Sequence, residues 1–157
     1  MAHTYMMQNR LVDAEKLYEA TLKNLSRANR GSKSSYLFSC MSFAQFKHHR
    51  YRDSVKSLLR SIHLNPSYLR DWYNIGIVSE ISATSTIASS GGDRVGDRSS
   101  GKVAQAADIL QAKKELLFAR DVFHSLGRIG GSQKQQLNYD KKSALSHEAV
   151  CQVRILI

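Results

Sequence analysis

The sequence predicts an all-α protein. One Pro in 157 residues, a hydrophobic fraction of 42% and few alternating β-branched runs favour helices over strands. A third observation is the stretch from Pro66 to Trp72 and then Ile75-Gly76, which is typical of the boundary between two helical repeats. The length allows a single domain with a hydrophobic core and requires no second one.

The boundary stretch matches the tetratricopeptide repeat (TPR) in its spacing. A TPR carries W-x2-L-G near its start and Pro near the end of a unit of about 34 residues. Trp72 and Ile75-Gly76 follow Pro66 at that spacing. We therefore expect a TPR-like α-solenoid of helix-turn-helix repeats, with one full repeat over residues 35–68 and the next one starting at Leu69.

A partial repeat is predicted over residues 1–30. Ala2, Tyr5, Ala14 and Tyr18 fall on the small and aromatic positions where the two helices of a TPR touch. A helix is expected over residues 12–26, followed by a basic loop insertion over 27–34. The chain is thus expected to be a segment of a larger array.

The full repeat is predicted to consist of two helices, the second of which begins at Tyr51 and stops at Asn65-Pro66. Ser42, Ser54 and Ser61 stand where the consensus has Gly or Ala. The side chains at these positions are therefore small, as the repeat requires, but polar.

The third repeat, over residues 69–126, is predicted to be split. Residues 82–101 are rich in Ser and Gly and are expected to form a disordered insertion. The pattern resumes at Ala119 and Phe123, about 31 residues later than a regular repeat allows.

Two long helices are predicted after this insertion. The first covers residues 102–126 and ends at Gly127. A capping box at Ser132 and Gln135 opens the C-terminal helix over 132–157. This helix is expected to pack on the long one through an apolar side that includes Ala144, Leu145, Ala149, Val153 and Leu156. The complete set of repeat-defining residues is Ala14, Tyr18, Tyr51, Pro66, Trp72, Gly76, Ala119 and Phe123.

Catalytic motifs are weak in this sequence. Gly96, Gly101 and Lys102 satisfy part of a phosphate-binding loop, but Val103 stands where Ser or Thr should hold Mg²⁺. The six His residues lack the spacing of a metal site, and no nucleophile elbow is present. The sequence predicts a protein that is not an enzyme and has no cofactor and no metal.

The net charge of +10 favours acidic partners, and weak nonspecific binding of nucleic acid is expected. The dense basic block from Lys47 to Arg52 is interpreted as a solvated turn, with RNA contact as the alternative. Cys40 and Cys151 are expected to be reduced, buried thiols. No signal peptide or long apolar run occurs, so the expectation is a soluble intracellular chain without a membrane partner.

A partner-binding groove is predicted on the first helices of the second and third repeats, because these helices line the concave face of a TPR array. An alternative is that the same residues contact neighbouring helices of a longer array. The predicted groove residues are Tyr36, Phe43, Phe46, Arg70, Tyr73 and Ile77.

The order of these features resembles one narrower family. Ala2-His-Thr-Tyr5, the repeats ending at Asn65-Pro66, the interrupted third repeat and the run from Ala119 to Phe123 are similar to the later TPRs of Ctr-nine-type scaffold subunits. These subunits belong to the Paf complex, the RNA polymerase II-associated factor. The resemblance extends from Met1 to about Ile155 and excludes residues 82–101.

The resemblance implies a nuclear, non-catalytic scaffold that supports transcription elongation by RNA polymerase II and co-transcriptional histone modification. Its implied partners are other Paf complex subunits and RNA polymerase II. Two alternatives remain. One is an unrelated TPR adaptor that binds a peptide of a chaperone or other partner, for which Arg70 and Lys47 are placed to contact carboxylates. The other is a basic RNA-binding helical module.

Overall fold

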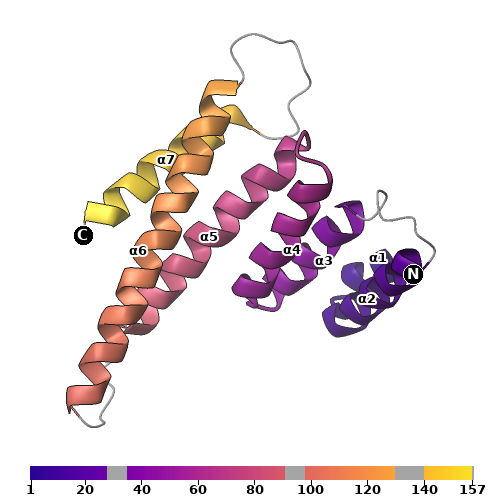
Figure 1. Cartoon of the computed structure of the whole chain (residues 1–157), viewed down its shortest axis with the longest axis horizontal. Coiled ribbons are helices and arrows are strands. Elements are labelled where there is room, and N and C mark those ends of the chain that lie inside the picture. Colours follow the sequence, from indigo (N-terminus) through magenta and orange to yellow (C-terminus); the bar gives the residue numbers. More distant parts are fainter. Residues whose placement is uncertain (28–34, 91–97, 130–139, 157) are drawn as a thin grey trace. The chain divides into compact units, whose positions relative to one another are not determined.

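The chain was studied as a computed structural model, which describes residues 1–27, 35–90, 98–129 and 140–156. Every regular element in these ranges is a helix, so the predicted all-α class is confirmed (Figure 1). The helices are α1 (Ala2–Met7), α2 (Leu11–Arg27), α3 (Ser35–Lys47), α4 (Tyr51–Leu64), α5 (Leu69–Ser90), α6 (Arg98–Ile129) and α7 (Lys141–Leu156).

The chain divides into two compact units. The first comprises Met1–Val78 and the second Ser79–Ile157. Helix α5 runs through this boundary, so its first turns belong to the first unit and its remainder to the second.

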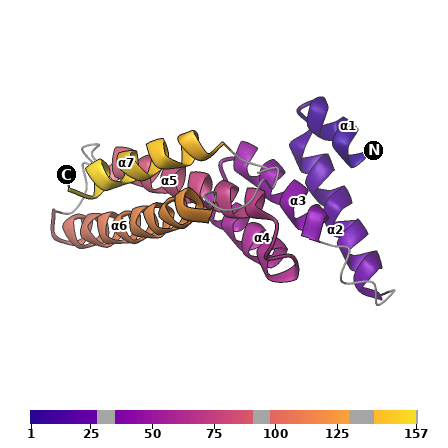
Figure 2. The same cartoon turned by 90° about the horizontal axis from the view of Figure 1, so that it is seen from above.

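In the first unit, helices that follow each other in the sequence pack together: α1 on α2, α2 on α3, and α3 on α4 (Figures 1 and 2). Ala14 and Tyr18 of α2 form a buried cluster with Cys40 and Met41 of α3. Because Ala14 has only a methyl group, the two helix backbones can approach each other, and the ring of Tyr18 fills the space beside it. Ala2 and Tyr5 of α1 also pack against this cluster.

Buried serines take part in the packing of α3 against α4. The hydroxyls of Ser42 and Ser54 lie 3.0 Å apart, and Ser54 also donates to the carbonyl of Ser42 at 2.9 Å. A buried hydroxyl is tolerated when it is hydrogen-bonded. These bonds explain why serine can occupy positions where a repeat usually has Gly or Ala.

Three hydrogen bonds hold the start of α5 in place. The indole Nε1 of Trp72 donates to the carbonyl of Pro66 at 3.0 Å. Asp71, which is fully buried in the first turn of α5, accepts hydrogen bonds from Ser39 of α3 at 2.7 Å and Ser61 of α4 at 2.5 Å. The start of α5 is therefore tied to both helices of the preceding pair.

The prediction of a disordered insertion starting at Ser82 is wrong for its first part, because α5 continues to Ser90. Ser82 and Ala83 are buried. The hydroxyls of Thr84 and Thr86 donate to the carbonyls four residues earlier, at 2.8 and 3.0 Å. These bonds satisfy polar groups within the helix, so a Ser- and Thr-rich composition does not end it. Of the predicted insertion, residues 91–97 lie outside the described ranges, and 98–101 belong to α6.

In the second unit α6 packs on α7, as predicted. The buried side of α6 repeats every three or four residues, which is the spacing of one helix face. Its members are Ala112, Leu116, Ala119, Val122, Phe123 and Leu126.

Gly127 does not end α6, contrary to the prediction, since the helix continues to Ile129. A Cβ atom placed on Gly127 would lie 2.8 Å from Cδ2 of Leu145 on α7. The absence of a side chain at Gly127 therefore serves close helix packing, and this glycine is not a helix stop.

Helix α7 begins at Lys141, directly after Asp140, whose side chain accepts a hydrogen bond from the backbone N–H of Lys142 at 3.1 Å. The predicted capping residues Ser132 and Gln135 lie outside the described ranges. The Asp140 side chain satisfies one of the free N–H groups in the first turn of α7.

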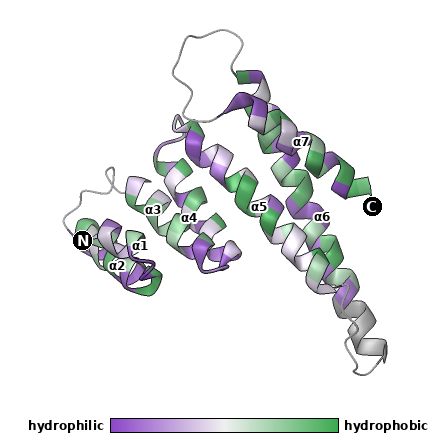
Figure 3. Cartoon of the chain, turned by 180° about the vertical axis from the view of Figure 1, so that it is seen from behind, coloured by the Kyte–Doolittle hydropathy of each residue, from purple (hydrophilic) through white to green (hydrophobic). Residues whose placement is uncertain are grey.

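The apolar side predicted for α7 is wrong for most of its members, although Leu145 lies against Gly127 of α6. Ala144 is buried, but Leu145, Ala149, Val153 and Leu156 are exposed, and Figure 3 shows hydrophobic residues recurring along this helix. The buried edge of α7 instead carries Ala144 and Cys151 together with two polar side chains that pair with α5, as described below.

Candidate interaction surface

One face of α3 carries two exposed aromatic rings. Tyr36 is 62% exposed and Phe43 49% exposed. They are seven residues apart, which is about two helical turns, so both rings are on the same face of the helix. Ser39 lies between them, and we call Tyr36, Ser39 and Phe43 the aromatic stripe.

Basic groups lie at both ends of the aromatic stripe. The ammonium of Lys47 is 5.6 Å from the centre of the Phe43 ring, within the range of a cation–π contact. At the other end a hydrogen bond with the Cys40 thiol raises the pKa of Tyr36, and the nearby charge of Arg70 acts in the opposite direction. Arg70 itself is exposed.

The hydrogen bond between Ser39 and Asp71 holds the first turn of α5 against the stripe. Of the predicted groove residues, Tyr36 and Phe43 are exposed on α3, and Arg70 is exposed on α5 next to Asp71. The other three, Phe46, Tyr73 and Ile77, are half-buried, and the ring of Phe46 lies 5.9 Å from that of Tyr51.

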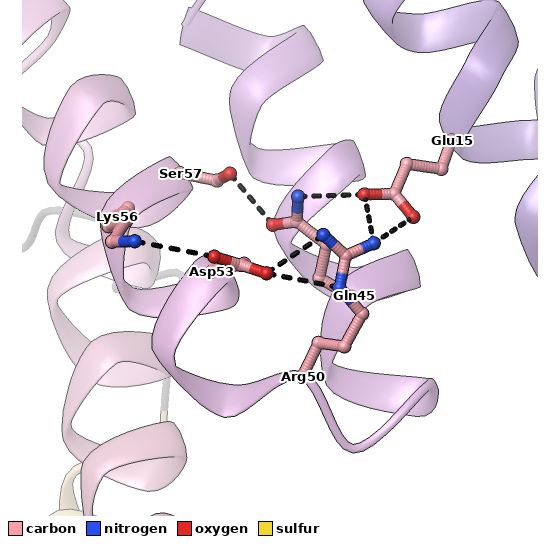
Figure 4. A network of polar contacts seen from close by, with 6 residues as sticks. All are labelled: Glu15, Gln45, Arg50, Asp53, Lys56 and Ser57. Carbon is pink, nitrogen blue, oxygen red and sulfur yellow. Dashed lines mark hydrogen bonds and ion pairs between the residues drawn. The ribbon is translucent and has the colours of Figure 1, made fainter.

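Behind this surface a network of polar side chains joins α2, α3 and α4 (Figure 4). Arg50 Nη1 lies 2.8 Å from both carboxylate oxygens of the buried Glu15. Gln45 donates to Glu15 at 3.0 Å and accepts a hydrogen bond from Ser57 at 2.8 Å. The carboxylate is thus buried with three hydrogen bonds, which offset its lost hydration.

Arg50 also bonds Asp53 at 3.0 and 2.8 Å, through Nε and Nη2. This hydrogen bond is the main reason why the pKa of Asp53 is lowered, and it also raises the pKa of Arg50. The basic block from Lys47 to Arg52 therefore has its central guanidinium engaged by two acids of the chain. This arrangement agrees with the interpretation of the block as a turn.

The repeat-defining residues occupy three environments. Those at helix–helix contacts are buried, whereas Tyr51 and Trp72 are half-buried and Pro66 is exposed. The buried ones are Ala14, Tyr18, Gly76, Ala119 and Phe123.

The second unit has a polar cluster around Glu80, a buried residue of α5. Glu80 lies 2.7 Å from Nδ1 of His147 and 2.9 Å from Nη1 of Arg154, both on α7. Arg154 also donates to Thr84, and the His147 ring stacks on Phe123 at 5.2 Å. Burial, together with the negative charge of Glu80, raises the pKa of the Cys151 thiol to about 11.

Sequence reasoning missed the buried acids Glu15 and Asp71, and it placed Glu80 on the concave face without predicting its burial. Their partners lie 35, 32 and 74 residues away in the chain, in Arg50, Ser39 and Arg154. The one available signal was an acidic residue at a position where the helical pattern calls for a buried side chain.

Within the described ranges, no group of three or more His, Cys, Asp or Glu side chains is arranged to hold a metal ion. A search of the helices over the same ranges found none that is both long and apolar enough to cross a membrane.

The chain was compared with known proteins at three levels. No family model matches it, and neither a curated protein nor a solved structure matches it. The fold and the surface define an all-helical chain that presents aromatic and basic groups together on its first unit.

Proposed function

We propose that this chain is a non-catalytic protein–protein interaction scaffold built from TPR-like repeats. The observation that carries the proposal is the aromatic stripe of α3. Its rings are 62% and 49% exposed, although α3 packs against both α2 and α4 on its other sides. Large exposed rings on a well-packed helix are typical of a surface that a partner covers.

Hydrogen bonds that hold α3 to its neighbouring helices favour binding of a partner without rearrangement of the aromatic stripe. A partly buried hydrogen bond holds Ser39 to Asp71, and a buried one holds Ser42 to Ser54. A rigid surface loses less conformational entropy when a partner binds. The proposed role requires shape and exposed side chains, and no reacting group.

The proposed setting is the nuclear Paf complex, in transcription elongation by RNA polymerase II and co-transcriptional histone modification. This narrower proposal rests on the resemblance of the repeat order and of residues 119–123 to Ctr-nine-type subunits. Its partners would be other Paf complex subunits and RNA polymerase II.

Affinity purification of the tagged full-length gene product, followed by identification of its partners, tests this setting. Recovery of Paf complex subunits and RNA polymerase II is the expected result. Recovery of chaperones without these proteins would contradict it and would favour the peptide-binding adaptor.

A matched pair of variants tests whether the aromatic stripe is the contact surface. Phe43→Ser removes a half-exposed ring of the stripe, whereas Leu59→Ser removes a similarly exposed side chain of α4. We expect Phe43→Ser to reduce recovery of at least one partner at least tenfold, since buried aromatic anchors dominate interfaces. Equal recovery with both variants would show that partners bind elsewhere.

A further inference from the structure

Helix α7 turns its acidic and basic side chains towards α5 and α6. Beyond its first turn these side chains are His147, Glu148 and Arg154. His147 and Arg154 lie 2.7 and 2.9 Å from the carboxylate of Glu80 on α5. Glu148 lies 2.8 Å from Nδ1 of His124 on α6. All three are therefore engaged on the side of α7 that packs within the second unit.

The opposite side of α7 is exposed and, beyond the first turn, uncharged. Its apolar members recur every three or four residues, so they lie on one face of the helix. On most packed helices the exposed side is the polar one, whereas here the charges are inside and apolar side chains are outside. We give the name outer face to Leu145, Ser146, Ala149, Gln152, Val153 and Leu156, which are all exposed.

The outer face matches itself in an antiparallel arrangement centred on Ala149. Residues equally far before and after Ala149 then lie at the same level in two copies of the helix. Leu145 of one copy lies level with Val153 of the other, and Ser146 with Gln152. Apolar groups thus meet apolar groups and polar groups meet polar groups, while the small side chain of Ala149 lets the two backbones approach at the centre.

The charges at the ends of α7 select the antiparallel direction. Lys142 is exposed in the first turn, and in this arrangement it lies level with Leu156 in the last turn of the other copy. The C-terminal end of a helix carries a partial negative charge, which attracts cations. A parallel pair would instead bring the two Lys142 side chains together.

We propose that the outer face of α7 joins two copies of this chain in an antiparallel, two-fold symmetric dimer. Such an interface uses the same surface on both copies, so assembly stops at two. Helix α7 has 16 residues and is about 24 Å long, which places the contact among small interfaces that dissociate on dilution. Dimerisation through α7 is independent of the aromatic stripe and of the proposed scaffold role.

A second copy fits this face better than a charged partner does. The outer face has no charged group with which to select an acidic or a basic protein. Repulsion between two copies of the second unit is also small, because this unit has 11 Lys and Arg against 8 Asp and Glu, a net charge of +3.

Sedimentation equilibrium of the full chain, between about 5 and 500 µM, tests the proposal in a range where weak dimers dissociate. We expect the average mass to rise with concentration from that of one chain towards that of two. High salt should not dissociate the dimer, because screening acts on charges and the seam is apolar.

Matched variants locate the contact. Val153→Glu places a charge in the seam and should weaken the dimer at least tenfold, since a buried unpaired charge is costly. The control is Leu110→Glu on α6, which should leave the dimer unchanged; Leu110 is 56% exposed and Val153 59%. Circular dichroism verifies that both variants keep their helical content.

Lys142→Glu tests the direction of the pair. It puts a carboxylate beside the C-terminal end of the other copy and should weaken the dimer severalfold. The same carboxylate lies in the first turn of its own helix, where a negative charge is favourable, so unfolding of α7 would not account for the effect.

Cysteine cross-linking tests the register. Ala149→Cys should form a disulfide-linked dimer on mild oxidation, because the two copies of this residue meet at the centre. Leu145→Cys alone should not, because its two copies would be about 12 Å apart along the seam, whereas its mixture with Val153→Cys should. Cys40 and Cys151 are buried, so the unaltered chain should not cross-link.

Four results would overturn the proposal. The first is a single-chain mass at every concentration, and the second is a mass that rises beyond two copies. The third is a dimer that Leu110→Glu disrupts and Val153→Glu does not, which would assign the contact to α6. The fourth is cross-linking of Leu145→Cys with itself as efficient as its cross-linking with Val153→Cys, which would contradict the antiparallel register.

Discussion

At the scale of single residues, Arg50 joins polar side chains of two helices of the first unit. Its guanidinium binds the carboxylates of Glu15 on α2 and Asp53 on α4 (Figure 4). Glu15 is buried, whereas Arg50 is half-exposed, so the ion pair stabilises the charge of Glu15 more than that of Arg50. Glu15 depends on Arg50, because a buried carboxylate without a cation is costly.

Arg50→Gln should lower the free energy of unfolding by about 1–2 kcal/mol, a value reduced for the exposure of the arginine. Urea unfolding followed by circular dichroism measures this change. The control is Arg52→Gln, which alters an exposed arginine two residues away and should change stability by less than about 0.5 kcal/mol. Combining Arg50→Gln with Glu15→Gln should restore part of the loss, because the buried charge is then absent; an additive loss would contradict this explanation.

Cys151 provides a second test at this scale. Burial raises the pKa of its thiol to about 11, and Glu80 adds to the effect. At pH 8 only about a thousandth of such a thiol is ionised, so it should react with a disulfide reagent far more slowly than an exposed cysteine. Glu80→Gln should speed the reaction by lowering this pKa.

The measurement uses a Cys40→Ser background, so that Cys151 is the one thiol observed. The released thiolate is followed by absorbance between pH 7 and 10. A rate at pH 8 equal to that of a free cysteine peptide would contradict the burial of Cys151.

At the scale of the elements, the helices α2, α3 and α4 were predicted well and α5 to α7 less well. Asn65-Pro66 ends α4 through local chemistry, since Pro cannot continue a helix without losing a hydrogen bond. The end of α5 is rich in Ser and Thr, and α6 contains Gly127. Both features are typical of the end of a helix. Packing and local hydrogen bonds outweigh these preferences, as tertiary context commonly does.

Gly127→Ala tests the close approach of α6 and α7. Alanine is favoured over glycine inside a helix by about 1 kcal/mol, but its Cβ would lie 2.8 Å from Leu145 Cδ2. Leu145 is half-exposed and can turn away, so we expect a net change in the free energy of unfolding of less than about 1 kcal/mol.

In a Leu145→Ala background the obstruction is absent, and Gly127→Ala should then stabilise the chain by about 0.5–1 kcal/mol. Thermal and urea unfolding of the four proteins of this cycle measure the coupling. Equal effects in both backgrounds would show that Gly127 and Leu145 are not in contact.

At the scale of the whole molecule, charge is divided unevenly between the two units. The first unit has +7 and the second, with 11 Lys and Arg against 8 Asp and Glu, has +3. Net positive charge attracts polyanions without selecting a sequence, and the attraction falls steeply with salt. The weak nucleic acid binding expected from composition should therefore arise mainly in the first unit.

Heparin chromatography tests this expectation with two matched variants. Lys16→Gln with Lys23→Gln removes two exposed charges from α2, and Lys113→Gln with Lys114→Gln removes two from α6. The α2 variant should elute at a lower salt concentration than the α6 variant, because its charges lie in the stronger potential. The reverse order of elution would contradict a concentration of charge in the first unit.

The sequence by itself determined the all-α class and most helix positions. Helical periodicity, small residues and a Pro stop act over a few residues, so they can be read locally. Tertiary structure alone decided which side of α7 is buried and that Glu15 pairs with Arg50. The pairs of Glu15 with Arg50 and of Glu80 with Arg154 join residues 35 and 74 positions apart, and no local pattern encodes such a pairing. The aromatic stripe lies between these cases, because spacing placed Tyr36 and Phe43 on one face and packing left that face exposed.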